Sequence, residues 1–461
     1  MDVREGISSQ PMRAFQVRVV GICLVLTVVD GFEMLMMAFV TPALAKTWGF
    51  GQTESGYLLS SSIIGLALGA LLVSPLADRM GRRPHTISCL VLITVGMICS
   101  TFVTSVAQMV TARILTGLFI GGILASLNVM VSEYASTARR ATVMSVYGMG
   151  LPLGTAVGGF ISGLLLSRYD WRAPFVFAAI ITATMALVCI IWLPESIHYL
   201  VERRPFGALA QYNAIAAKLG YRQVEELPEP VSTEHSRSLR HAAFSGLMLT
   251  RTIWLWTGFS LLTAAFYFAN TWSAKLLADV AKDTQTGINA GVLIAVGGVI
   301  GALLMAALNT RLRPRLVTAT FMFLACFAFL AYANFFTTVT AAYLLAVVVG
   351  IFATGAIIGT YAIAPHTYPT AVRASAVGLM IATIRGVSFV APIAVGYLLD
   401  AGWTPRVTYQ AFAGLLVLAA FCMYMLERTY RGRTEDPEQA VHESAGQLAQ
   451  TPATQVGATA D

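Results

Sequence analysis

The stretch LTVVDGFEMLMMAFVTP, residues 26–42, is apolar enough to lie in a lipid bilayer, yet it contains Asp30 and Glu33. Because they are three positions apart, the two acids project from the same face of a helix. A charged side chain in mid-membrane costs about 2.5–3.5 kcal/mol on insertion scales, so it normally faces protein or a cavity. The stretch predicts a membrane helix with a functional acidic face. The alternative is a pair of acids that only support helix packing through a neighbouring Ser, Asn or backbone group.

The composition of the whole chain is that of a polytopic membrane protein. Of its 461 residues, 57% are hydrophobic and 11% are charged, which is too little charge to cover a soluble protein of this size. The sequence shows no phosphate-binding loop, nucleophile elbow or metal-binding Cys/His cluster, which argues against an enzyme, ATP-driven transport, a metal site or a cofactor. The six cysteines lie in apolar runs and are interpreted as small core residues: Cys23, Cys89, Cys99, Cys189, Cys326 and Cys422.

Twelve apolar segments are long enough to cross roughly 30 Å of hydrocarbon as helices. The first of them is too long for a cleavable signal. The predicted spans are 18–42, 56–77, 86–105, 108–132, 141–167, 173–193, 251–275, 286–308, 315–334, 338–363, 374–399 and 406–426.

The distribution of Lys and Arg predicts the orientation of these spans. With the N-terminus inside, the inner loops, the linker and the termini hold 21 of the 30 basic residues, and the outer loops hold six. This bias explains the net charge of +7 without a nucleic-acid partner. We expect a cytoplasmic N-terminus (1–17), two six-helix bundles (18–193 and 251–426) joined by a polar cytoplasmic linker (194–250), and a disordered cytoplasmic tail (427–461).

The two halves of the chain repeat each other. SEYASTARRATVMS (132–145) follows the fourth span and PHTYPTAVRASAVG (365–378) follows the tenth, and a shift of 233 residues places Arg140 on Arg373. PLADRMGRR (75–83) has a weaker basic counterpart in ALNTRLRPR (307–315). A parallel repeat of two six-helix halves resembles the major facilitator superfamily, an all-α integral membrane fold with substrate bound between the halves.

PLADRMGRR also resembles the signature that this superfamily carries between its second and third helices, although Ser74 stands where that signature begins with Gly. An acid at a helix end beside arginines forms an ion-pair latch that can hold one conformation and release in another. Positive-inside charge alone explains the arginines but not the acid. We expect a gate formed by Asp78, Arg79, Gly81, Arg82 and Arg83.

A closer resemblance is to the aromatic acid:proton symporters of the benzoate and hydroxybenzoate type. That branch has D-G-F/Y-D in its first helix, and Asp30-Gly31-Phe32-Glu33 departs from it only by Glu for the second Asp, which puts the role of Glu33 in doubt. Further similarities are LNVMVSEYASTARRA (127–141), YDWRAPF (169–175) and LPESIHYLVERR (193–204). The resemblance implies a transporter of a bacterial-type inner membrane that imports a small organic anion with protons and acts as a monomer.

Two nearby carboxylates in a low dielectric do not both ionise easily, so Asp30 and Glu33 are expected to titrate as a unit and carry the proton. Arg385 lies about eleven residues into the eleventh span, near the same depth as Asp30. Its planar guanidinium matches a carboxylate, and the resemblance also implies a carboxylate-binding arginine here. The alternative is a structural ion pair of Arg385 with Asp30 or Glu33, and the two interpretations can coexist.

Arg113 opens RILTGLFIGG, which resembles the helix 4 motif of the superfamily; it is either a proton relay or part of an outer structural ion pair. Glu133, with Arg139 and Arg140, lies at the inner end of that helix and is expected to gate. GMGLPLGTAVGG (148–159) lacks the Gly-Pro dipeptide of the exporter signature, which favours uptake.

An aromatic acid needs stacking surfaces and polar anchors, and FYFANTWSAKLL (266–277) offers both. The candidates for substrate binding are Phe266, Tyr267, Asn270, Trp272 and Asn128. Aromatic residues of membrane helices also pack against lipid or lie in the interfacial belt, so each has that alternative. His366 is either a proton relay or a structural histidine.

The sequence thus predicts a twelve-helix proton symporter for an aromatic carboxylate. The alternatives within transport are a non-aromatic carboxylate, a muconate-like dicarboxylate, or export instead of uptake. An alternative from another class is a nutrient sensor that signals through residues 194–250 and the tail.

Overall fold

The computed structural model describes residues 3–228, 246–368 and 370–431. Within these ranges, twelve helices or helix pairs are long and apolar enough to cross a membrane, which confirms the predicted number. In the first half they are α2 (Ala14–Trp48), α3 (Gln52–Leu72) with the short η1 (Ser74–Leu76) and α4 (Ala77–Met80), α5 (Arg82–Phe102), α6 (Val106–Tyr134), α7 (Arg140–Gly148) with α8 (Gly150–Arg168), and α9 (Ala173–Trp192). In the second half they are α13 (Gly246–Ala281), α14 (Thr284–Asn309), α15 (Pro314–Phe335), α16 (Val339–Thr367), α17 (Thr370–Asp400) and α18 (Pro405–Arg428).

Several helices extend beyond the apolar segments predicted from sequence. The first span was predicted as 18–42, whereas α2 continues to Trp48, where Gly49 adopts a left-handed conformation with φ of 68° and ends it. Hydropathy detects only the part of a helix that matches lipid, while the helix itself runs on until a residue stops it. The predicted tail lies largely outside the described residues, as do residues 229–245 of the predicted linker.

The fifth span, predicted as one helix over 141–167, is divided in two at Met149, between α7 and α8. Pro152 lacks an N–H group and so leaves the carbonyl group four residues earlier, on Gly148, without its helical partner. A proline next to glycines is a usual cause of a break in a membrane helix.

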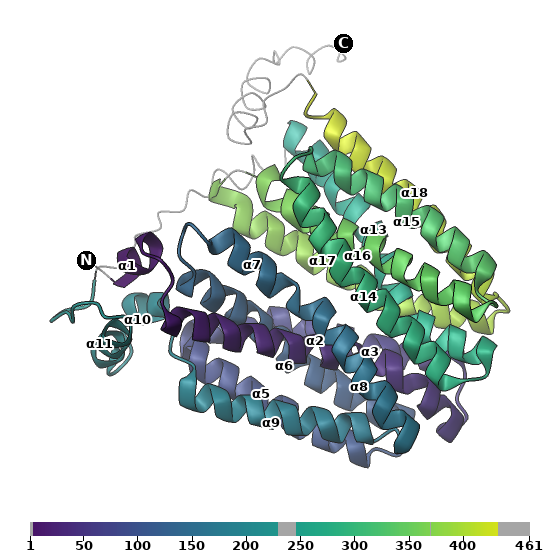
Figure 1. Ribbon diagram of the computed structural model, residues 1–461, viewed down its shortest axis with the longest axis horizontal. Helices are drawn as coiled ribbons and strands as arrows, with labels where there is room; N and C mark the ends of the chain where they lie inside the picture. The colour runs from purple at the N-terminus through teal and green to yellow at the C-terminus, as the bar shows by residue number, and fades with distance from the viewer. Residues whose placement is uncertain (1–2, 229–245, 369, 432–461) are drawn as a thin grey trace, which may run out of the picture.

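Equivalent helices pack together in the two halves. In the first half α3 packs on α6, α5 on α9 and α2 on α8; in the second half α14 packs on α16, α15 on α18 and α13 on α17. These pairs correspond one to one under the internal repeat, so the twelve helices form two six-helix bundles of the same design (Figure 1).

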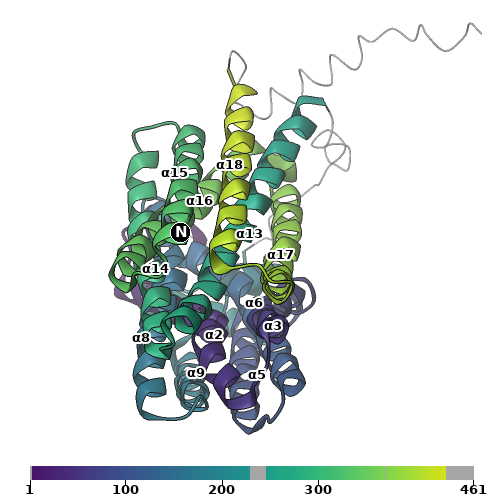
Figure 2. The ribbon, with the colours of Figure 1, turned by 90° about the vertical axis from the view of Figure 1, so that its right-hand side faces the viewer.

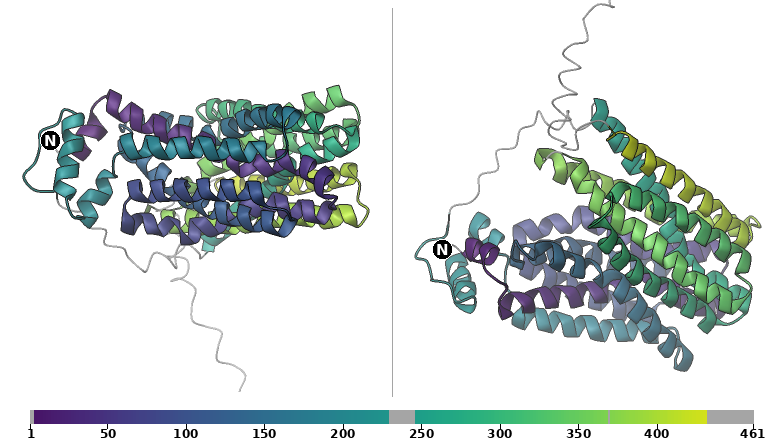
Figure 3. Two further views of the ribbon diagram at one scale, coloured as in Figure 1. Left: turned by 90° about the horizontal axis from the view of Figure 1, so that it is seen from below. Right: turned by 45° about the horizontal axis from the view of Figure 1, so that its top comes forward.

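The two bundles meet at one end of the molecule and spread apart at the other (Figures 1 and 3). We call the spread end the linker end, because α9 ends there and the short helices α1 (Val3–Ser9), α10 (Ile197–Arg203) and α11 (Ala208–Lys218) lie beside it. The opposite end is called the far end. There α3 packs on α17 and α8 on α14, so one helix pair on each side joins the bundles (Figure 2).

Candidate functional site

The acidic pair of the first span is buried inside the first bundle. Asp30 is 1% exposed and Glu33 is 0% exposed, among the core residues of that bundle. Among the described residues, neither Asp30 Oδ2 nor Glu33 Oε2 has a hydrogen-bond partner. Buried polar atoms in proteins are nearly always paired, so these two carboxylate oxygens on one helix face keep the acidic pair a candidate site.

Glu33 takes part in a buried network that joins four helices. The Thr182 hydroxyl of α9 donates a hydrogen bond to Glu33 Oε1. Arg113 of α6, which is 0% exposed, donates to the Glu33 backbone oxygen at 2.6 Å and to Ser62 Oγ of α3 at 3.2 Å. The Arg113 guanidinium also lies within electrostatic range of the Glu33 carboxyl. Arg113 therefore contacts Glu33 through its backbone oxygen, and its role as a proton relay stays a prediction.

Asp30 lies one turn before Glu33 on the same helix face, beside the break in the fifth span. Its carboxyl lies near the buried phenol of Tyr147 of α7, and Thr27 lies next to Tyr147. Gly31 brings α8 close to this turn, because a side-chain carbon on Gly31 would collide with the Leu151 backbone. Glu33 therefore contacts α6 and α9 in the bundle, whereas Asp30 lies beside the interrupted helix formed by α7 and α8.

Arg385 of α17 lies in the second bundle and its described partners are tyrosines. Its Nη1 donates to Tyr267 Oη of α13 at 2.9 Å, and Tyr361 of α16 lies within range of its charge. The Tyr361 ring packs edge-on against Phe259, with ring centroids 5.0 Å apart, and is 39% exposed. In the part of the chain that the structure describes, Arg385 forms no ion pair, so the pair with Asp30 or Glu33 left open by the sequence is not formed in this conformation.

The other predicted substrate residues differ in their surroundings. Phe266 packs edge-on against Tyr267 at 5.4 Å, and the Asn270 amide donates to the Phe266 backbone oxygen at 2.9 Å. Trp272 is fully buried, and its indole donates to the Pro392 oxygen at 3.1 Å, so it fastens α13 to α17 inside the bundle.

Two predicted polar residues lie toward the linker end. Asn128 is exposed, and its amide donates to the Leu124 oxygen of its own helix at 3.1 Å. His366, in the last turn of α16, is also exposed. Neither is brought to Arg385 by a described contact.

At the far end, hydrogen bonds cross between the bundles. The Asp400 carboxylate of α17 accepts from the backbone N–H groups of Gln52 and Thr53 at 3.3 and 2.9 Å, and from the Thr53 hydroxyl at 2.5 Å. One turn further, the Tyr57 and Tyr397 hydroxyls are 2.5 Å apart. These five residues, the far-end clamp, place a carboxylate of one bundle on the N-terminus of a helix of the other, where its unpaired N–H groups favour an anion. Sequence reasoning missed Asp400, because its partners are distant in the chain.

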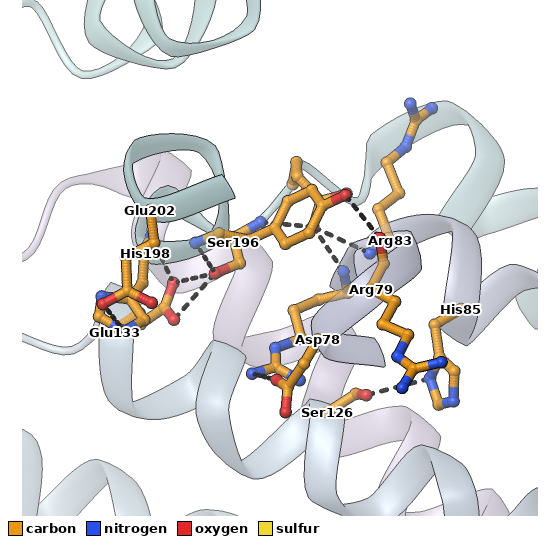
Figure 4. A network of polar contacts seen from close by, with 12 residues as sticks. Asp78, Arg79, Arg83, His85, Ser126, Glu133, Ser196, His198 and Glu202 are labelled. Carbon is orange, nitrogen blue, oxygen red and sulfur yellow. Dashed lines mark hydrogen bonds and ion pairs between the residues drawn. The ribbon is translucent and has the colours of Figure 1, made fainter. Parts of the chain in front are cut away.

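At the linker end, the predicted gate forms a compact polar network (Figure 4). Asp78 pairs with Arg82 at 2.6 Å. Glu195 Oε1 accepts from the N–H groups of Arg82 and Arg83 at 2.7 and 3.1 Å, and so caps α5. Gly81 supplies the turn with φ of 97°, which favours glycine.

Glu195 was not singled out from the sequence, although it lies in the LPESIHYLVERR segment that carried the resemblance. Burial raises the pKa of its carboxyl, while hydrogen bonds from backbone N–H groups oppose that shift. A capping carboxylate on α5 from the segment after α9 ties the third and sixth spans together at this end.

Glu133 belongs to the same network. Its carboxylate accepts from the Ser196 hydroxyl at 2.8 and 2.9 Å, while His198 pairs with Glu202 at 2.9 Å (Figure 4). Tyr199 of α10 donates to the Arg79 backbone oxygen at 3.1 Å. The network therefore holds α10 against the first bundle. The remaining predicted gate residues, Arg139 and Arg140, are exposed.

Comparisons with known proteins agree with this architecture. The family model described as Major Facilitator Superfamily matches residues 22–345 and 281–456. The chain is 29% identical over 428 residues to the 4-hydroxybenzoate transporter PcaK of Pseudomonas putida, covering 91% of this chain and 94% of the relative. It is 27% identical to a gallate transporter of Pseudomonas putida, covering 82% and 84%, and 23% identical to a benzoate transport protein of Acinetobacter baylyi, covering 87% of each.

Solved structures show the same fold. The partially occluded inward open conformation of the xylose transporter XylE from E. coli matches with a TM-score of 0.71 at 16% identity, covering 92% of this chain and 100% of that one. A bacterial homolog of the lysosomal transporter Spinster, in an inward-facing and occupied conformation, matches with a TM-score of 0.69 at 15% identity, covering 91% and 98%. The twelve spans, the repeated helix pairs and the matching family model lead to one conclusion: the chain belongs to the Major Facilitator Superfamily, whose members are membrane transport proteins and not enzymes.

Proposed function

We propose that this protein imports an aromatic carboxylate together with protons by alternating access. The observation that carries the proposal is the charge distribution between the bundles. Arg385 is a membrane-embedded cation with tyrosine partners, whereas Asp30 and Glu33 are buried in the opposite bundle. A cation without a counter-acid at this depth is costly unless an anion from outside the protein binds to it.

The first bundle supports the proton-coupling part of the proposal. Asp30 and Glu33 share a buried region with one arginine, Arg113, so the group has one negative charge in excess when both acids are ionised. A buried charge without a partner is strongly unfavourable, and one bound proton removes it. Because Arg113 bonds the backbone of Glu33 as well as facing its charge, it positions that carboxyl for proton exchange.

The second bundle supports the substrate class. The planar guanidinium of Arg385 can accept a carboxylate through two parallel hydrogen bonds. Tyr267 holds that guanidinium from one side, and the partly exposed ring of Tyr361 offers a stacking surface close to it. The names of the relatives, for 4-hydroxybenzoate, gallate and benzoate, favour an aromatic acid over the aliphatic alternatives.

The conformation suggests how transport proceeds. With the linker end in the cytoplasm of a bacterial inner membrane, the present state opens inward and the far-end clamp is closed to the outside. Outside pH loads the acidic pair and the anion binds Arg385; the neutralised site then lets the bundles rock, and cytoplasmic pH releases the proton. The linker-end residues Asp78, Arg79, Gly81, Arg82, Arg83, Glu133, Arg139 and Arg140 form the inner gate. We propose a monomer that uses no cofactor.

The test uses purified protein in liposomes with a trapped pH dye and no imposed gradient. Benzoate, 4-hydroxybenzoate and gallate are compared with an aliphatic monocarboxylate and an aliphatic dicarboxylate. Lumenal acidification above protein-free liposomes is expected with an aromatic acid, and is expected to be lost in Asp30→Asn and Arg385→Ala. The matched control is Arg406→Ala. Arg406 is exposed, lies far from the two acids, and donates a hydrogen bond to Asn334 Oδ1 at 2.7 Å.

Three outcomes would overturn parts of the proposal. Acidification by aliphatic acids alone would replace the substrate class and leave proton symport in place. Uptake of a radiolabelled aromatic acid without acidification, or normal transport by Asp30→Asn, would show that the acids are structural and that proton coupling is wrong.

A further inference from the structure

A groove runs along the outer surface of the first bundle between α2 and α9. It encloses about 510 Å³. On each helix its lining residues recur at helical spacing, so each helix contributes one continuous face. They are Arg18, Gly21, Ile22 and Val25 of α2 and Met185, Val188 and Trp192 of α9.

The groove has one polar end. Arg18 lies near the start of α2 and Trp192 is the last residue of α9, and since the helices are antiparallel, both lie at the linker end. Trp192 is 51% exposed, and Arg18 is exposed with no hydrogen bond or ion pair to any described residue. Nearby, Lys218 of α11 lies over the Phe15 ring, at 5.6 Å, one turn before Arg18.

The rest of the groove is apolar and open down to the backbone. At Gly21 an added side-chain carbon would meet no atom within 4 Å. Ile22, Val25, Val188 and Met185 continue from there toward the middle of the span. A groove with a cation at headgroup depth and an apolar floor along the helices is complementary to a phospholipid, whose headgroup is charged and whose acyl chains are apolar.

We propose that this groove binds an anionic phospholipid, with the phosphate on Arg18 and one acyl chain along Gly21. The guanidinium binds phosphate through two parallel donors, and Trp192 lies where tryptophan favours the headgroup boundary. A basic residue near a membrane surface contributes about 1 kcal/mol to binding of anionic lipid. This free energy corresponds to about a fivefold preference over a zwitterionic lipid. The site is independent of the substrate site, since it faces lipid on the outside of one bundle.

The experiment uses the full-length protein in vesicles of dioleoyl phosphatidylcholine with increasing fractions of brominated lipid. Bromine quenches nearby tryptophan, and the contribution of Trp192 is the difference between the protein and its Trp192→Phe variant. Brominated phosphatidylglycerol is compared with brominated phosphatidylcholine. We expect about a fivefold preference for phosphatidylglycerol at Trp192, reduced by high salt because the attraction is electrostatic.

Three variants sharpen the test. Arg18→Gln is expected to abolish the preference while both lipids still quench. Gly21→Leu fills the floor of the groove and is expected to weaken quenching by both lipids without changing any charge. Arg311→Gln, an exposed arginine of the second bundle between α14 and α15, is expected to keep the wild-type preference.

The proposal is wrong if wild-type protein shows no preference at Trp192, or if Arg18→Gln retains it. If Arg311→Gln loses the preference for phosphatidylglycerol as fully as Arg18→Gln does, the preference comes from the overall charge of the protein surface and not from a site at the groove. If Arg18→Gln does not fold, the Gly21→Leu result decides alone, and unchanged quenching there rejects the groove as the binding place.

Discussion

The far-end clamp yields the sharpest prediction, because one side chain, Asp400, accepts three of its hydrogen bonds across the two bundles. Asp400 accepts two backbone N–H groups at the start of α3 and the Thr53 hydroxyl. These bonds join the two bundles, so we expect them to break when the far end opens. Replacing Asp400 by Ala should therefore shift the balance between closed and open far ends toward open, without touching either buried charge site.

The magnitude follows from the contacts. Removing a side chain that caps a helix N-terminus costs about 0.5–2 kcal/mol, and the clamp is exposed, so its charge is partly screened. We expect a loss of about 1–2 kcal/mol for Asp400→Ala, which is about a fivefold to thirtyfold fall in the closed-to-open ratio. Asp400→Asn keeps one oxygen acceptor and should lose less.

The assay is pulsed electron spin resonance between spin labels on two exposed far-end positions, Thr47 and Ala401, each replaced by Cys. The exposed Cys99 is changed to Ser in this background. The ratio of the short to the long distance population reports the conformational balance. Thr404→Ala is the matched control. The Thr404 hydroxyl caps α18 within the second bundle, where it accepts a hydrogen bond from the Val407 N–H at 3.3 Å, and it is not part of the far-end clamp.

A ratio for Asp400→Ala within twofold of wild type, with the variant still folded, would refute the reasoning. It would mean that the helix packing of α3 on α17 and α8 on α14 alone sets the balance. An equal shift in Thr404→Ala would also refute it, since that substitution weakens a cap without crossing the bundles.

Three further predictions concern single residues. Arg113→Gln should abolish proton-coupled uptake and lower the melting temperature. It removes the charge near Glu33 and a hydrogen bond from a charged group to the Glu33 backbone oxygen, a loss of about 1.5–3 kcal/mol. Ser62→Ala removes one neutral partner and should cost about 1 kcal/mol, and thermal unfolding in detergent compares the two variants. Tyr361→Leu should raise the KM for an aromatic acid severalfold with little change for an aliphatic one, whereas Tyr361→Phe should keep the stacking surface, as concentration series of uptake would reveal. Hydrogen bonds from the Thr286 hydroxyl and from backbone N–H groups hold the pKa of Asp283 below its usual range. The ionised Asp283 carboxylate therefore stabilises the folded protein above the pKa of the unfolded chain, and this stabilisation is lost as the pH falls through the pKa of the folded protein. Asp283→Asn should lower the melting temperature at pH 7 and have less effect at pH 3.

The number of spans and their grouping could be predicted from the sequence because both depend on local properties. Each span is a run of about 20 apolar residues, and the lipid imposes that length whatever the neighbours are. The internal repeat, with Arg140 on Arg373, identified the two halves because duplicated segments retain their local pattern. The acids at 30 and 33 stood out because their cost in lipid is local too.

The partners of those residues could not be predicted, since they are set by packing between distant segments. Arg113 reaches Glu33 across 80 residues and Tyr267 reaches Arg385 across 118, and no spacing rule in one helix encodes either contact. Glu195 caps α5 across 113 residues for the same reason. The sequence by itself thus determined which helices cross the membrane and which charges they carry. Only the tertiary structure decided that the acids are buried beside Arg113 and that Arg385 has tyrosine partners, because the side-chain environment in a helix bundle depends on which faces meet.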